Sequence, residues 1–259
     1  MVRMIKTEML KLRRYHIIWA GVLLMLLSDL LTLFSSTALD GTVWNFAYFT
    51  EQVIKNNVTT IFPVCITLIA GYIIAREEKD DTLKSIMTVP VSYNELLFGK
   101  AAVCALLSLF FGVMSTVFTV LTVYLAGFPG IDVVSVLQAC VQITLNCLFL
   151  YIAMTPVILI AVRIPNGHMV GTIIAFVYGY GGMFVSGNMT LANLYPVTAS
   201  MGLINYRSYD AAVHWNVLAN LCSLFVAFVV SALLIMTAKG NAPTKSAKAA
   251  KKKVTKKGW

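Results

Sequence analysis

Six apolar runs, each long enough to cross a lipid bilayer, constrain this chain more than any other feature of its sequence. They lie at residues 17–36, 57–75, 100–126, 136–162, 169–187 and 213–238. A helix needs about 20 mostly apolar residues to cross the ~30 Å of hydrocarbon in a bilayer. The hydrocarbon offers no water to the backbone, so each spanning segment has to satisfy its own hydrogen bonds as a helix. The sequence therefore predicts an all-α polytopic membrane protein with six transmembrane helices.

The charged residues are too few to coat a soluble globule, and nearly all of them lie between the apolar runs or at the two ends of the chain. Charged residues make up 12% of the 259 residues, against 59% hydrophobic residues. Soluble domains carry about twice that charged fraction. The net charge of +9 alone could suggest a nucleic-acid partner. We expect no nucleic-acid partner, because membrane proteins place their charges in the loops in this way.

The distribution of lysine and arginine predicts the orientation of the chain. Of the 20 lysines and arginines, eighteen fall before the first run, in alternate loops or after the last run. The opposite side has only Lys55 and Arg207. Basic residues accumulate on the cytoplasmic side of membrane proteins. Both termini are therefore predicted to be cytoplasmic.

Three regions are expected along the chain. Residues 1–16 are predicted to form an interfacial amphipathic helix, because Val2, Ile5, Met9 and Leu12 recur at helical spacing between basic residues. The alternative for this region is a plain extension of the first span. Residues 17–238 form the six-span domain. Residues 239–259, rich in lysine and without apolar periodicity, are predicted to be a basic disordered cytoplasmic tail drawn to anionic lipid.

Two outer segments are unusual. Residues 37–56 are predicted to be a long loop whose aromatic residues anchor it at the membrane interface or contact an amphiphilic substrate; these are Trp44, Phe46, Tyr48 and Phe49. Residues 188–212 are apolar but too short to cross, and Pro196 interrupts them. A pair of short half-helices that dip into the outer leaflet fits this pattern, provided that protein buries their free backbone groups.

The loop between the second and third spans, residues 76–100, is the most informative inner segment. Its first half is charged, and Asp80 and Lys84 form a favourable i, i+4 pair on a predicted helix. Pro90 then disfavours helix at the preceding residue. Ser92 and Glu95 form a capping box that begins a second helix. A helix, a proline break and a second helix at the inner face suit the docking of another protein, and an ordinary solvated loop is the alternative.

The sequence lacks the common motifs of membrane-bound and ATP-dependent enzymes. No Gly-x-x-x-x-Gly-Lys-[Ser/Thr] string occurs, so the chain has no P-loop with which to bind ATP. Neither His-Glu-x-x-His nor Gly-x-Ser-x-Gly is present. The five cysteines lie inside apolar runs without a Cys-x-x-Cys pair, as packing residues do. We therefore expect no catalytic residue, metal or cofactor in this chain.

Asp29 is the one acidic residue deep inside a predicted span. A charge inside the membrane is costly and marks a candidate functional site by default. The alternatives are a protonated or hydrogen-bonded structural group, a position near the outer end of the span, or a face that contacts a partner subunit.

The inner loop gives the chain a family resemblance. Its acidic start, followed by D-T-L-K-S-I-M-T-V-P-V-S at 81–92 and E-L-L-F-G-K at 95–100, resembles the permeases of the ABC-2 family. Among these the chain is most similar to the six-span permeases of bacitracin and lantibiotic resistance or immunity. Adjacent Asp80 and Asp81 stand where many members have a glycine before the threonine. The resemblance implies that this loop is a coupling helix against the ATPase, and that the contact includes Glu77, Glu78, Lys79, Asp80, Thr82, Leu83, Pro90 and Val91.

The resemblance also implies partners and a function. It implies an interfacial elbow helix at residues 1–16, a separate ABC ATPase subunit and a second permease chain, identical or a sibling, in a bacterial plasma membrane. The expected function is to couple ATP hydrolysis on the ATPase to export or membrane extraction of an amphiphilic peptide or lipid-linked substrate. The alternatives are an ATP-independent secondary transporter, which would need ionisable residues along a midplane path, and a membrane sensor or scaffold subunit.

Overall fold

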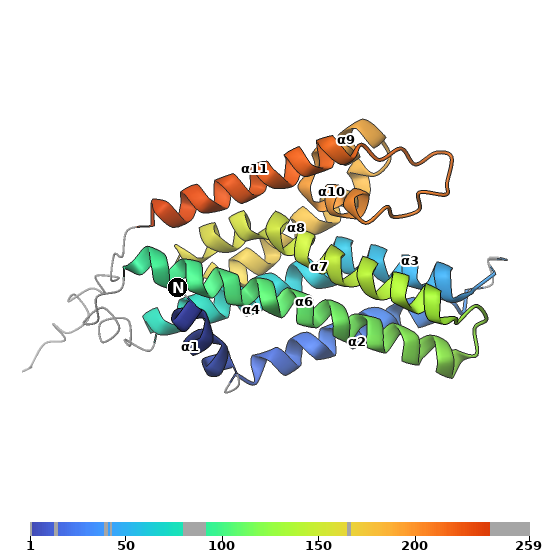
Figure 1. The fold of residues 1–259 in the computed structure, drawn as a ribbon, viewed down its shortest axis with the longest axis horizontal. Coiled ribbons are helices and arrows are strands. Elements are labelled where there is room, and N and C mark those ends of the chain that lie inside the picture. Colours follow the sequence, from blue (N-terminus) through green and yellow to red (C-terminus); the bar gives the residue numbers. More distant parts are fainter. Residues whose placement is uncertain are drawn as a thin grey trace, which may run out of the picture.

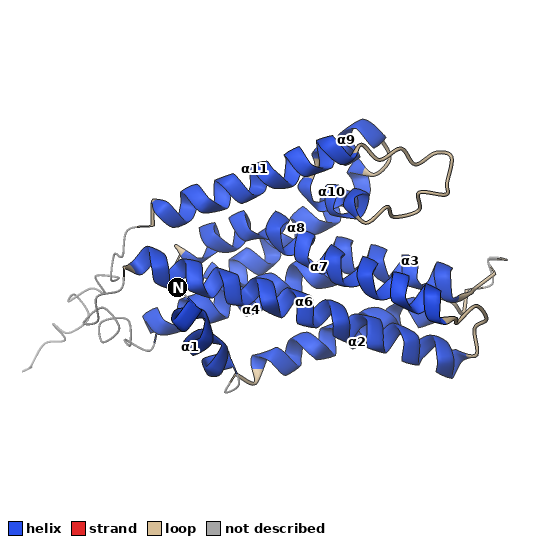
Figure 2. Cartoon of the chain, viewed as in Figure 1, coloured by secondary structure: helices blue, strands red, loops and turns tan. Residues whose placement is uncertain are grey.

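A computed structural model describes residues 2–12, 15–38, 41, 43–79, 92–164 and 167–238 of the chain. Within these residues the protein is a bundle of long helices, and Figure 2 shows only helices and loops there. Six helical segments are long and apolar enough to cross a membrane. The prediction of an all-α polytopic membrane protein with six transmembrane helices is confirmed.

The long helices run along the axis of the bundle, and short helices cover its two ends (Figure 1). The elements in chain order are α1 (Val2–Leu12), α2 (Ile17–Ser35), α3 (Phe46–Asn56), the π-helix η1 (Asn57–Ile61), α4 (Phe62–Lys79), α6 (Tyr93–Ala126), α7 (Val133–Val162), α8 (Gly167–Val185), α9 (Met189–Leu194), α10 (Pro196–Leu203) and α11 (Val217–Met236).

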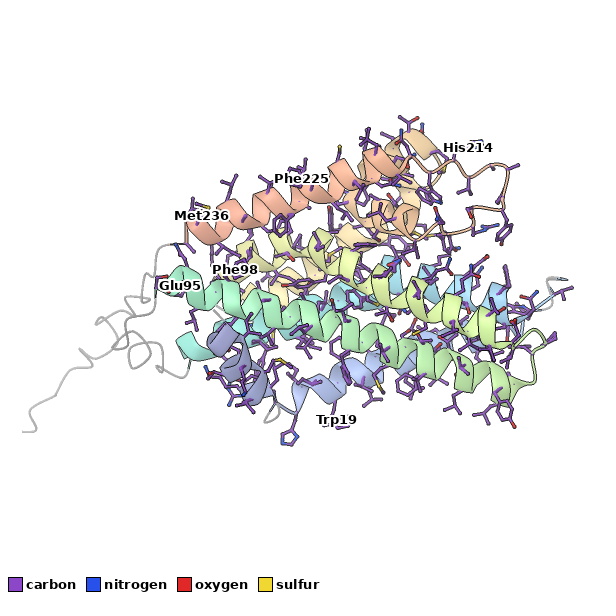
Figure 3. The ribbon with its side chains drawn as sticks, in the orientation of Figure 1. Trp19, Glu95, Phe98, His214, Phe225 and Met236 are labelled. Carbon is purple, nitrogen blue, oxygen red and sulfur yellow. The ribbon has the colours of Figure 1, made fainter. Side chains whose placement is uncertain are left out.

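Much of the surface of the bundle is apolar, as a lipid-facing surface has to be. Only 22% of the α8 span and 33% of the α2 and α11 spans are buried within the protein. Figure 3 shows Trp19, Phe225 and Met236 on the outside of the bundle, and their side chains are 65–72% exposed. A soluble protein rarely exposes apolar patches of this extent. Lipid is therefore the solvent for these helices.

The second span differs from the prediction at its outer end. The sequence predicted a loop over 37–56, but α3, η1 and α4 form one continuous helical segment from Phe46. Asn45 begins it, because its Oδ1 accepts a hydrogen bond of 2.9 Å from the backbone N–H of Tyr48. The loop prediction is therefore wrong for residues 46–56. Two polar residues of α3, Glu51 and Asn56, find partners in distant segments, on Tyr209 and Thr32.

The prediction that the aromatic residues of 37–56 anchor the chain at the lipid interface is wrong for Phe46 and Phe49. Both rings are fully buried in a cluster with Val123 of α6 and Ala139 of α7. Helix α3 packs against the outer ends of α6 and α7. The rings therefore fill the space between three helices.

Two short helices, α9 and α10, precede the last span, as predicted for residues 188–212. Asn188 caps α9, since its side chain accepts a hydrogen bond from the N–H of Thr190. Pro196 is the first residue of α10, where its missing N–H costs nothing. Both helices pack against α8 and α11. Protein therefore covers this interrupted segment.

The inner end also matches the prediction where the structure describes it. Ser92 and Glu95 form the reciprocal capping box that begins α6. Helix α1 packs against α6. Its Glu8 is buried and pairs with Lys11. The first helix is thus held on the bundle by the inner end of α6.

Candidate functional site

The predicted contact with the ATPase falls partly outside the described residues. Glu77, Glu78 and Lys79 belong to the last turn of α4. The remaining positions lie outside the described residues; these are Asp80, Thr82, Leu83, Pro90 and Val91. The structure does describe α4 and α6, the two helices that flank this segment, and the contacts that hold them.

The inner end of α4 is fixed to the start of the first span. The guanidinium carbon of Arg76 lies 4.5 Å from the ring centroid of Tyr15 and 5.8 Å from that of Tyr72. The two tyrosine rings meet edge to face at 6.3 Å. Cation–π contacts of this kind contribute about 0.5–2 kcal/mol each. Arg76 therefore joins the segment between α1 and α2 to the last turns of α4.

Lys100 joins α6 to α4 close to the same end. Its side chain is only 3% exposed, and its Nζ donates a hydrogen bond of 2.8 Å to the carbonyl oxygen of Ile73. One residue further along α6, the carbonyl of Ala101 accepts a hydrogen bond of 2.7 Å from the hydroxyl of Tyr151 on α7. Hydrogen bonds from an ionised donor are roughly twice as strong as neutral ones. The inner thirds of α4, α6 and α7 are thus connected.

Sequence reasoning missed the role of Lys100, which was counted only as a loop charge that sets orientation. A lysine near the end of a span commonly extends toward water along an apolar surface. This lysine instead points into the protein. The local sequence contains no signal that separates these two arrangements, because the accepting carbonyl is that of Ile73 on another helix.

Asp29 lies in the protein interior rather than toward lipid. Its side chain is fully buried, and its Oδ1 accepts a hydrogen bond of 2.8 Å from Thr119 on α6. Around it, Asn56 donates to Thr32 at 2.9 Å and Asn57 donates to Ser115 at 3.1 Å. These bonds join α2, the end of α3, the π-helix and α6. Single-turn π-helices occur frequently at functional sites.

Asp29 is expected to tolerate the loss of its charge but not of its oxygen. Asparagine keeps a carbonyl oxygen for Thr119, so Asp29→Asn should leave the unfolding temperature within a few degrees of the wild-type value. Asp29→Leu removes this acceptor and leaves the Thr119 hydroxyl with only the carbonyl of Ser115, at 2.9 Å, so the bond between α2 and α6 is lost at a cost of about 0.6–2 kcal/mol. Thermal unfolding of the purified protein in detergent measures both effects. Equal stability of the two variants would contradict a structural role for this bond.

A cavity of about 230 Å³ opens at the outer end of the bundle. It lies between the α3–η1 junction, the end of α8, the α9–α10 pair and the segment 204–216. Its lining includes two cationic side chains, Lys55 and Arg207. The apolar part of the lining includes Val58, Met183, Met189, Met201, Val213 and Trp215. Methionine side chains adapt to ligands of irregular shape.

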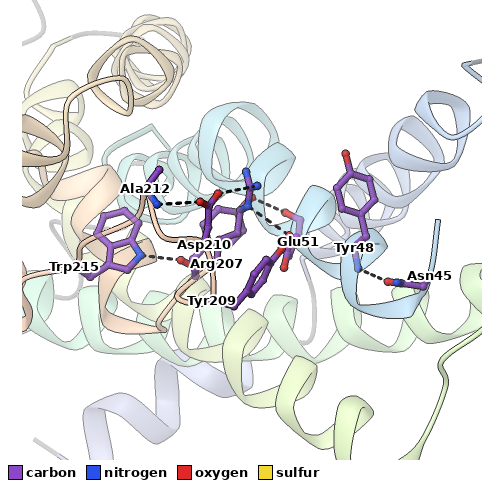
Figure 4. Close-up of polar contacts among 9 residues, drawn as sticks. Asn45, Tyr48, Glu51, Arg207, Tyr209, Asp210, Ala212 and Trp215 are labelled. Carbon is purple, nitrogen blue, oxygen red and sulfur yellow. Dashed lines mark hydrogen bonds and ion pairs between the residues drawn. The ribbon is translucent and has the colours of Figure 1, made fainter. Parts of the chain in front are cut away.

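The segment 204–216 is held over this cavity by polar contacts, most of which Figure 4 shows. The indole N–H of Trp215 donates to the carbonyl of Tyr206 at 2.7 Å. Nη2 of Arg207 donates to Oδ2 of Asp210 at 3.2 Å, and Nε of Arg207 lies 3.7 Å from Oε2 of Glu51. Arg207 has a left-handed backbone with φ of 48°. The wall of the cavity is therefore built by specific contacts between segments distant in the sequence.

The tyrosines of this wall are neutral hydroxyl groups. The Tyr206 hydroxyl donates to the carbonyl of Glu51 at 3.3 Å, and the Tyr209 hydroxyl donates to Oε2 of the same residue at 2.8 Å. Burial raises the pKa of Tyr206 above its ordinary value. Burial and the Glu51 carboxylate raise the pKa of Tyr209. Both phenols therefore keep their protons at neutral pH and hold the backbone and side chain of Glu51.

These observations define a polytopic helical membrane protein. Polar and cation–π contacts join its helices at the inner end, and a cavity opens at the outer end. Residues 4–182 match the model of the family described as ABC-2 family transporter protein. The match covers more than two thirds of the chain, and the chain belongs to this family. It is a membrane permease component of an ABC transporter, and the family implies an ABC ATPase as its partner. No curated protein matches the chain.

Proposed function

We propose that this chain couples ATP hydrolysis on a separate ATPase subunit to export, or extraction from the membrane, of an amphiphilic substrate. A peptide antibiotic of the bacitracin or lantibiotic type is the substrate that the resemblance of the inner loop favours. The observation that carries the proposal is the pair of ties at the inner end, Arg76 with Tyr15 and Lys100 with Ile73. The first connects α4 to the segment before α2, and the second connects α6 to α4, so the two helices that flank residues 80–91 are held to each other and to the first span.

The expected mechanism is a change between two arrangements of the permease, driven from the inner face. ATP binding closes the partner ATPases, and the segment around Glu77–Val91 follows. Because α4 and α6 are tied to α2 and α7, a displacement of this segment moves the inner ends of several spans together. A second permease chain, identical or a sibling, completes the pathway. The substrate site then changes its affinity between the two arrangements.

The contact with the ATPase is tested by co-purification from the host. Wild-type permease should retain an ABC ATPase through affinity purification. Leu83→Asp combined with Glu77→Ala should reduce the retained ATPase about tenfold, because an apolar contact and a charge are lost from the docking surface. Val43→Asp is the matched control, since Val43 lies on the outer side and is 79% exposed. Undiminished association of the double variant, at equal amounts of permease in the membrane, would place the contact elsewhere.

The substrate class is tested in cells. Deletion of the gene should make the host more sensitive to an amphiphilic peptide antibiotic, and the wild-type gene should restore growth. Unchanged sensitivity to a panel that includes bacitracin and several lantibiotics would remove the peptide-antibiotic part of the proposal. The ATPase association would stand in that case.

The alternative function, that of an ion-driven transporter, has little support in the described spans. Such a transporter needs ionisable groups along a path near the midplane. Among the described residues, the buried ionisable acidic and basic side chains are Glu8, Asp29 and Lys100. Two of them lie at the inner end, on α1 and at the start of α6, and already have partners. Asp29 would have to carry an ion pathway by itself.

A further inference from the structure

The two cationic residues of the outer side meet at one cavity. Lys55 and Arg207 are the only lysine and arginine that the charge distribution assigns to that side, and both line the cavity. They come from α3 and from the segment between α10 and α11. A low-dielectric cleft that concentrates charge of one sign attracts ligands of the opposite sign. The ligand of this cavity is therefore expected to carry negative charge.

The two cations have different roles. Arg207 is held between the carboxylates of Glu51 and Asp210, so its guanidinium is fixed in position and largely neutralised. Lys55 is exposed, and no ion pair of its ammonium group is found among the described residues. Lys55 is thus the charge available to a ligand. Arg207 keeps one edge of the cavity wall in place.

The remainder of the lining suits the start of an apolar chain. Met183, Met189 and Met201 surround the cavity together with the indole of Trp215, whose N–H already has a partner. Pockets that enclose a whole drug-sized ligand measure about 300–1,000 Å³. This cavity, at about 230 Å³, has room for a head group and the first part of a tail. The rest of such a ligand would have to remain outside.

The cavity lies at the level of the outer membrane interface. About 20 helical residues cross the hydrocarbon. Counting back that far from Arg76, at the inner end of α4, reaches Asn57 at the start of η1, two residues after Lys55. Met183 lies close to the outer end of α8, and its side chain is 48% exposed. A tail that passes Met183 would enter the outer leaflet.

We propose that this cavity binds the anionic head group of an amphiphile from the outer leaflet. The head-group oxygens accept hydrogen bonds from the ammonium of Lys55 beside the Arg207 edge. The first part of the tail lies against Trp215 and the methionines. This inference deepens the proposed function, on which it rests, because it names the chemical class of the substrate and its point of entry.

Binding is measured with brominated single-chain probes on the full chain in an uncharged detergent. The probes are 4-bromoundecyl phosphate, which carries its bromine on the first part of the tail, and its phosphocholine counterpart, which has the same tail and a zwitterionic head. Bromine quenches nearby indoles, so the quenching that wild type shows and Trp215→Phe lacks reports occupancy of the cavity. The phosphate probe should bind about tenfold more tightly than the phosphocholine probe. Lys55→Gln should remove that preference, because one charge-assisted hydrogen bond is lost.

Lys55→Arg should restore the preference for the phosphate probe, and Lys6→Gln should leave it unchanged, since Lys6 is an exposed lysine on the cytoplasmic helix α1. Undiminished discrimination in Lys55→Gln would overturn the assignment of the head-group site. If inorganic phosphate competed as strongly as the phosphate probe does, the proposal of an amphiphilic ligand would be rejected. The ligand would then be a free anion. None of these readouts involves the ATPase. Failure here together with intact co-purification therefore rejects the head-group site alone, and loss of co-purification with intact probe binding rejects the coupling proposal alone.

Discussion

Replacing Gly112 by valine is expected to separate α6 from α7 and to destabilise the protein by about 3 kcal/mol. A Cβ atom at this position would lie 2.6 Å from the backbone Cα of Thr144 and 3.3 Å from the carbonyl oxygen of Ile143. The backbone of α7 cannot rotate away as a side chain can, so the two helices have to move apart. Overpacking a close-packed interior costs about 1–3 kcal/mol, and small residues are what allow membrane helices to approach.

The size of the new side chain should set the size of the loss. Gly112→Ala is expected to destabilise the protein less than Gly112→Val when unfolding is measured in mixed micelles with added dodecyl sulfate. Gly187→Ala is the matched control, because the nearest atom to a Cβ there is the carbonyl oxygen of Phe184 at 3.7 Å. Wild-type stability in Gly112→Val would mean that α6 and α7 do not approach as closely as described.

The spans could be predicted because their signal is local. A run of apolar residues as long as the bilayer is thick has few alternatives to a transmembrane helix. The start of α6 was equally predictable, since the Ser92–Glu95 capping box depends on residues three positions apart. The break at Pro196 between α9 and α10 is of the same kind. Each of these features is determined by residues within one short stretch of sequence.

The outer end of the second span could not be predicted because its signal is not local. Glu51 and Asn56 make residues 46–56 look like a polar loop, and the predicted span begins only at Asn57. In the structure Glu51 accepts a hydrogen bond from Tyr209, 158 positions along the chain, and the two asparagines donate to Thr32 and Ser115. A hydropathy scale counts the free-energy cost of burying these polar groups in a transmembrane helix, but it does not count the hydrogen-bond partners that offset this cost. The inward direction of Lys100 could not be predicted either, because the carbonyl that accepts its hydrogen bond belongs to another helix.

The sequence identified the two cationic residues of the cavity but not the cavity itself. Counting lysines and arginines identified Lys55 and Arg207 as the exceptions to the inner bias, but only to set the orientation of the chain. An exception to that rule is a candidate binding residue, and the fold brings both exceptions to one site. Their proximity depends on how the segment after α10 folds back over α3, which no periodicity in either segment predicts.

Asn193→Leu is expected to disconnect the α9–α10 pair from α11, at a cost of about 3 kcal/mol. The side chain of Asn193 is only 8% exposed. Its Nδ2 donates to the carbonyls of Met189 at 2.7 Å and His214 at 3.1 Å, and its Oδ1 accepts from the N–H of Asn216 at 2.9 Å. Leucine has a similar size but removes all three of these hydrogen bonds, which link α9 to the half-buried backbone groups of His214 and Asn216. Each such bond contributes about 0.5–1.5 kcal/mol.

Two comparison variants separate the lost hydrogen bonds from a change in helix capping. Asn193→Asp keeps the acceptor for Asn216 and should fall between wild type and Asn193→Leu in dodecyl sulfate unfolding. Asn188→Ala removes the exposed cap of α9 and should cost only about 1 kcal/mol. Because α9 and α10 supply one wall of the cavity, Asn193→Leu should also lose the Trp215 quenching by 4-bromoundecyl phosphate. The inner end lies across the bundle from this change, so the retained ATPase should stay constant, and a parallel loss of both readouts would show that the whole chain had unfolded.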